Sequence, residues 1–111
     1  DHMLESLRLT RSYVEGFSKE AFLADKKTQQ AIILNIMVIG EAAIQILDED
    51  PEFAVRYPDV PWKQMRGMRN RMAHGYFDLN LDVVWDTVIK ALPKLEHQVL
   101  AIRQEQEAND R

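Results

Sequence analysis

The sequence predicts an all-α protein folded as an up-and-down four-helix bundle. Apolar residues recur at steps of three and four over long stretches, which is the period of amphipathic helices. Only four glycines and four prolines interrupt the chain, too few for the turns of a protein with many short strands. A chain of 111 residues is the size of one ordinary domain. We therefore expect a single helical domain over residues 1–111.

The first half of the chain predicts a long central helix preceded by shorter helical segments. Residues 3–16 place apolar side chains on one helical face, and Gly16 fits a helix end. Ser18 begins a short helical turn. Asp25 is expected to be the N-cap of a helix that runs to about Asp48. The apolar surface of this helix is wide, so we expect it to be nearly covered by its neighbours.

Prolines divide the second half of the chain. Since proline cannot continue a helix, residues 50–61 are expected to form a loop, with Pro61 at the first position of the next helix. Gly75 is expected to end that helix. The last helical segment spans residues 81–102, and Pro93 is expected to kink it near Ile89.

Composition excludes several classes of protein. Without cysteine, the chain cannot form disulfides, zinc–thiolate sites, iron–sulfur clusters or a cysteine nucleophile. The longest apolar run, residues 31–39, is too short and too polar to span a membrane. No secretion signal opens the chain, so a cytoplasmic protein is expected.

Charge is unevenly distributed along the chain. The net charge is −4, from 14 basic and 18 acidic side chains, which disfavours binding to nucleic acid by the molecule as a whole. Residues 62–76, however, hold four cations and no acid, and the remaining residues sum to −8. This segment is the one that suits a phosphate-bearing ligand.

Residues 69–76, RNRMAHGY, carry the side chains that suit phosphoryl chemistry. Histidine exchanges protons near neutral pH, and arginine binds phosphate bidentately. No clustered carboxylates or paired histidines accompany them, so neither a metal nor another cofactor is expected. Such a set suits a ribonuclease, in which a 2′-hydroxyl attacks the adjacent phosphorus and leaves a 2′,3′-cyclic phosphate. A lone histidine at a helix end and arginines on a solvated face are nevertheless common without any catalytic role.

Helical geometry separates the candidate side chains. An inward face holds Met65, Met68 and Met72, and the opposite stripe holds Arg66, Asn70 and His74. Arg69 lies about 140° around the helix from His74. The two can converge on one atom only if the helix ends early at Gly75, or if a second copy of the chain completes the site.

The motif of residues 69–76 matches R-x(4)-H-x-Y, and the chain resembles the HepT-like toxins of the HEPN superfamily. The resemblance covers essentially the whole chain. Segments 25–31 and 39–43 look like the long second helix of the family. Later family features follow in the expected order, at Pro61-Trp62, Val84-Trp85 and Leu92-Pro93.

The resemblance implies a homodimeric helical bundle in which two motif helices meet in a cleft. It implies a metal-independent endoribonuclease that acts on RNA, with Arg69 and His74 as catalytic residues. Asn70, Arg66 and Arg71 would be auxiliary or RNA-binding residues. Tyr76 would be AMPylated by a partner, an MNT-type nucleotidyltransferase antitoxin, which would silence the toxin.

A second hypothesis is a non-catalytic interaction subunit that docks a nucleotidyltransferase and binds its nucleotide. It predicts a tight complex with that partner and no cleavage of RNA. The joint presence of Arg69, His74 and Tyr76 favours the toxin, because a docking subunit has no need of all three.

Overall fold

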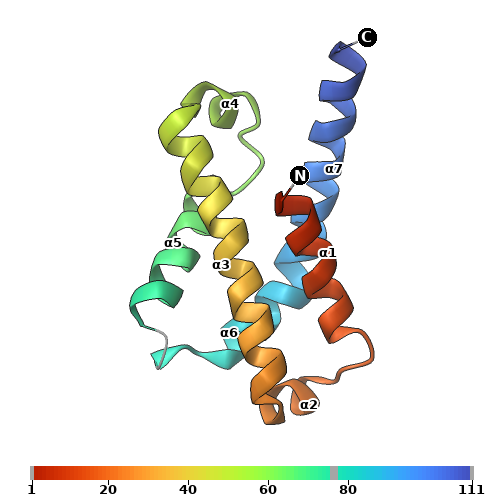
Figure 1. Ribbon diagram of the computed structural model, residues 1–111, viewed down its shortest axis with the longest axis vertical. Helices are drawn as coiled ribbons and strands as arrows, with labels where there is room; N and C mark the ends of the chain where they lie inside the picture. The colour runs from red at the N-terminus through yellow and green to blue at the C-terminus, as the bar shows by residue number, and fades with distance from the viewer. Residues whose placement is uncertain (1, 76–77, 111) are drawn as a thin grey trace.

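The computed structural model describes residues 2–75 and 78–110, and within them all regular elements are helices (Figure 1). This confirms the predicted all-α fold. The four longest helices run alternately down and up the long axis of the molecule: α1 (His2–Val14), α3 (Lys26–Glu49), α5 (Trp62–His74) and α7 (Leu92–Asn109). Shorter helices connect them.

The residues at the end of α1 and at the starts of α2 and α3 are those that the sequence predicts. Gly16, just after α1, has a φ of +79°, a left-handed conformation that glycine adopts without strain. Ser18 caps α2 (Lys19–Ala24). Asp25 caps α3 by accepting hydrogen bonds from the backbone N–H and hydroxyl of Thr28, at 3.1 and 2.9 Å. These hydrogen bonds stabilise the carboxylate and lower the pKa of Asp25.

The expectation of a loop over residues 50–61 is wrong in part, because a short helix, α4 (Pro51–Arg56), begins there. Asp50 caps this helix by accepting a hydrogen bond from the N–H of Phe53. Pro51 is tolerated in the first turn because an N–H at that position would have no acceptor within the helix. Pro61 lies at the N-cap of α5 and not at its first helical position.

The last segment is divided into α6 (Leu81–Asp86), a π-helical turn η2 (Thr87–Ala91) and α7. The N–H of Leu92 donates to the carbonyl of Thr87, five residues back. This irregularity immediately precedes Pro93, which has no N–H with which to continue the α-helical pattern. The kink expected near Ile89 remains a prediction. The helix itself continues to Asn109, beyond the expected end at residue 102.

Helix α3 is the central element, with α1 on one side and α5 on the other (Figure 1). Its buried apolar residues form much of the core: Ile32, Ile33, Ile36, Ile39 and Ala43. By length and composition alone α3 is long and apolar enough to cross a membrane. In this fold its buried apolar residues pack within the bundle. The expectation that α3 is nearly covered is wrong, because Leu34 and Val38 are 62% and 38% exposed.

Helix α3 lies directly against α5 at Gly40. A Cβ atom at this position would meet the Cβ of Arg69 and would lie 2.9 Å from the carbonyl oxygen of Met65. Glycine is required here because backbone and helical stem leave no room for a methyl group.

We predict that Gly40→Ala destabilises the protein by about 1–3 kcal/mol, because the added methyl group forces α3 and α5 apart. Gly67→Ala is the matched control, since a methyl group at residue 67 would have nothing within 4 Å of it. That change raises helix propensity and is expected to stabilise by up to about 1 kcal/mol. Urea unfolding of both variants measures the difference, and equal effects would contradict the close contact.

Candidate functional site

Helix α5 carries the motif and presents two different faces. Its inward face is apolar as predicted, with Met65 and Met72 buried and Met68 partly buried. The opposite stripe is also as predicted from the helical period: Arg66 is half-buried, and Asn70 and His74 are exposed. The candidate polar groups are therefore accessible to a ligand.

Arg69 has two polar partners, Glu41 on α3 and Asn70 on its own helix. Its Nε lies 3.0 Å from Oε2 of Glu41, and its Nη1 donates to Oδ1 of Asn70 at 3.1 Å. Sequence reasoning assigned no role to Glu41. The available signal was its position directly after Gly40, as an acid that follows an apolar run of the central helix.

Arg69 and His74 are not brought together within one chain. No hydrogen bond or ion pair joins them among the residues that the structure describes, and α5 remains helical through His74. The N–H of Gly75 closes the helix on the carbonyl of Arg71 at 2.8 Å. The helix thus ends at His74 without a hydrogen bond or ion pair between the two side chains in the described part of the chain. A site completed by a second copy of the chain remains a prediction.

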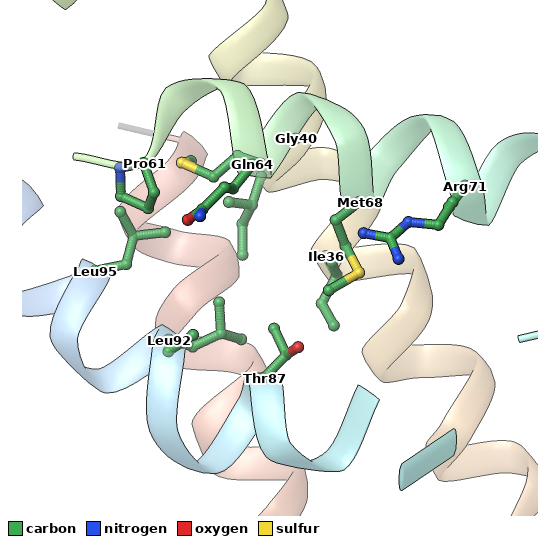
Figure 2. Close-up of a pocket in the computed structure, with 12 residues that line it drawn as sticks. Ile36, Gly40, Pro61, Gln64, Met68, Arg71, Thr87, Leu92 and Leu95 are labelled. Atoms are coloured by element: carbon green, nitrogen blue, oxygen red, sulfur yellow. The ribbon is translucent and has the colours of Figure 1, made fainter. Parts of the chain in front are cut away.

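Arg71 lies on another side of α5, where it lines a cavity of about 330 Å³ between α5 and the η2–α7 segment. Figure 2 shows its guanidinium directed toward Met68, with Thr87 and Leu92 across the cavity. The walls are mostly apolar: they include Ile36, Ile39, Met65, Leu92 and Leu95. The structure therefore separates Arg71 from Arg69, although the two are close in sequence.

The positive charge of α5 is only partly neutralised by the rest of the chain. Within residues 2–75 and 78–110, Glu41 pairs with Arg69, whereas Lys63, Arg66 and Arg71 have no acidic partner. A surface with unpaired cations attracts phosphates. The local excess predicted from the sequence thus persists in the fold.

Two further expectations concern a metal site and the modification of Tyr76. Over the described ranges, no three histidine or carboxylate side chains gather as metal ligands. Tyr76, the expected modification site, lies outside the described residues.

Comparison with known proteins places the chain in a family. The model of the "Ribonuclease HepT-like" family matches residues 3–102. The chain belongs to the HepT-like ribonuclease family. Among its relatives, "Probable ribonuclease HepT" of Thermococcus cleftensis is 33% identical over 103 residues, covering 93% of this chain and 91% of the relative. No solved structure matches the chain.

A second relative spans nearly the same length. The protein named "Putative RNase TTE0752" from Caldanaerobacter subterraneus subsp. tengcongensis is 34% identical over 106 residues, covering 96% of this chain and 92% of the relative. The similarity therefore extends over the whole helical domain and is not confined to the motif. Family and relatives together support a ribonuclease function for this chain.

Proposed function

We propose that this chain is the toxin of a toxin–antitoxin pair, a cytoplasmic, metal-independent endoribonuclease. Its reaction is the attack of an RNA 2′-hydroxyl on the adjacent phosphorus, which breaks the bond to the 5′-oxygen of the next nucleotide and leaves a 2′,3′-cyclic phosphate. The observation that carries the proposal is the family match over residues 3–102, together with the exposed basic face of α5.

The proposed catalytic residues are Arg69 and His74. An exposed imidazole at the end of α5 is able to exchange the protons of the 2′-hydroxyl and the leaving oxygen. The guanidinium of Arg69 stabilises the negative charge that develops on the phosphate oxygens. Asn70, Arg66 and Arg71 are proposed to bind or orient RNA. For Arg71 this requires RNA to reach the cavity side of α5.

A homodimer is proposed to complete the site. Leu34, Val38 and Glu41 succeed one another along one stripe of α3, opposite the buried Ile36. The first two are exposed apolar residues, and the third pairs with Arg69. Pairing this stripe with a second copy buries apolar surface and brings the α5 helices of both chains to the same interface.

The proposed antitoxin is an MNT-type nucleotidyltransferase that transfers AMP from ATP to Tyr76. The hydroxyl oxygen of the tyrosine forms the new bond to the α-phosphorus, pyrophosphate leaves, and the phenolic proton is released. Tyr76 follows His74 by two residues. An adenylate there adds bulk and negative charge, and both effects oppose the binding of RNA.

We predict that His74→Ala lowers RNA cleavage by about 10²- to 10⁴-fold, the typical contribution of a general acid–base group. His97→Ala is the matched control, because His97 is also exposed but lies on α7. A fluorescent RNA assay with purified proteins measures both rates. Full activity of the His74→Ala variant would refute the proposed site.

The dimer makes a separate prediction. Leu34→Asp places a charge in the proposed interface and is expected to yield a folded monomer with little RNA cleavage. Val55→Asp is its control, since Val55 is 78% exposed on α4, away from the α3 stripe. Light scattering after size-exclusion chromatography gives the mass of each variant. A dimer that survives Leu34→Asp unchanged would exclude this face.

Modification is tested by intact mass. Wild type expressed with the nucleotidyltransferase encoded beside it is expected to gain one AMP and to lose RNA cleavage, whereas Tyr76→Phe gains none. An unmodified wild-type chain that binds the transferase tightly and leaves RNA intact would support the docking-subunit hypothesis instead.

A further inference from the structure

Glu41 follows Gly40, at which α3 lies directly against α5. Because Gly40 has no side chain, the stem of Arg69 rests directly on the α3 backbone. The following residue, Glu41, then reaches the Nε edge of the guanidinium at 3.0 Å, while Nη1 donates to Asn70. Nη2 has no partner among the described residues. Two contacts thus orient the guanidinium and leave one nitrogen free.

The ion pair of Glu41 and Arg69 is poorly placed to stabilise the fold. In the single chain the side chains are 50% and 30% exposed, respectively, so water and salt screen their attraction. The pair therefore contributes little to the stability of the single-chain fold. A role in the proposed reaction explains the pair better than a role in folding.

A carboxylate beside a phosphate-binding arginine has an electrostatic cost. It repels RNA. It also neutralises one of the four cations of α5, a helix that has no acid of its own. Such an acid lowers RNA affinity, and it benefits the reaction only if the orientation that it gives to Arg69 matters more than the charge that it removes.

We propose that Glu41 is a positioning residue for the reaction. It fixes the Nε edge of Arg69 so that the Nη2 end is presented to the phosphate that undergoes cleavage. Arginine binds phosphate through N–H groups in a planar fork, so a rotated guanidinium loses this match. The inference rests on the proposed ribonuclease function, and it assigns Glu41 no contact with RNA.

The proposal predicts a split between the two kinetic constants. Glu41→Gln removes the charge that restrains Arg69, so kcat falls roughly 10- to 100-fold, the scale expected for a misplaced catalytic group. KM for RNA stays equal or falls, because a repelling charge is gone. Glu49→Gln is the matched control: Glu49 is an exposed acid of α3 with no ion pair in the described part of the chain, and its removal leaves kcat unchanged.

The effect must act through Arg69. In an Arg69→Lys background, Glu41→Gln is expected to change the remaining kcat less than about twofold, because non-additivity marks residues that act as a unit. Glu41→Gln that cleaves as fast as wild type, or faster, would overturn the proposal. So would an undiminished effect in the Arg69→Lys background.

A readout without RNA separates this inference from the proposed function. In the wild type, NMR should show one narrow, slowly exchanging arginine Nε–H signal that is absent in Arg69→Lys. Glu41→Gln should broaden it and Glu49→Gln should retain it. A mobile Arg69 in the wild type would overturn the positioning role whatever the activity. A restrained Arg69 in a chain that cleaves no RNA would refute the ribonuclease and not the positioning.

Discussion

The contact between α3 and α5 at Gly40 is the constraint on which the site depends. It sets the spacing of the two helices and rests the Arg69 stem on the α3 backbone. It also brings Glu41 to the guanidinium. A methyl group at residue 40 would disturb packing and the candidate site together, because the same atoms serve both. The basic helix α5 thus packs directly on α3, the central helix of the bundle.

The distribution of charge and apolar surface points to one functional side of the molecule. The chain is acidic overall, yet α5 carries no acid, and among the described residues three of its cations have no acidic partner. Next to it, α3 exposes Leu34 and Val38, which a folded single chain leaves uncovered. A second copy on this stripe would remove the apolar surface from water and join two basic helices. The proposed dimer would allow Arg69 of one copy and His74 of the other to act on one phosphate.

Periodicity and capping residues predicted most of the fold. Asp25 and Gly16 could be predicted because both act locally. The Asp25 side chain caps α3, and Gly16 adopts a positive φ after α1. The sequence predicts a loop where α4 forms, because proline usually ends a helix. Pro51 instead lies in the first turn of α4, and Asp50 caps that helix. The role proposed for Glu41 could not be predicted from the sequence, because it depends on contact with Arg69 on another helix. Periodicity also overstated the burial of α3, because it cannot show whether a neighbour covers each apolar side chain.

The most direct test of the proposed chemistry is cleavage of a short RNA that carries a single 2′-deoxy nucleotide on the 5′ side of the mapped cut, with a metal chelator present. We expect the unmodified RNA to be cut to a 2′,3′-cyclic phosphate and the substituted bond to remain intact, because the attacking hydroxyl is gone. Cleavage of the deoxy-substituted bond, or loss of all cleavage on chelation, would contradict a metal-independent attack by the 2′-hydroxyl.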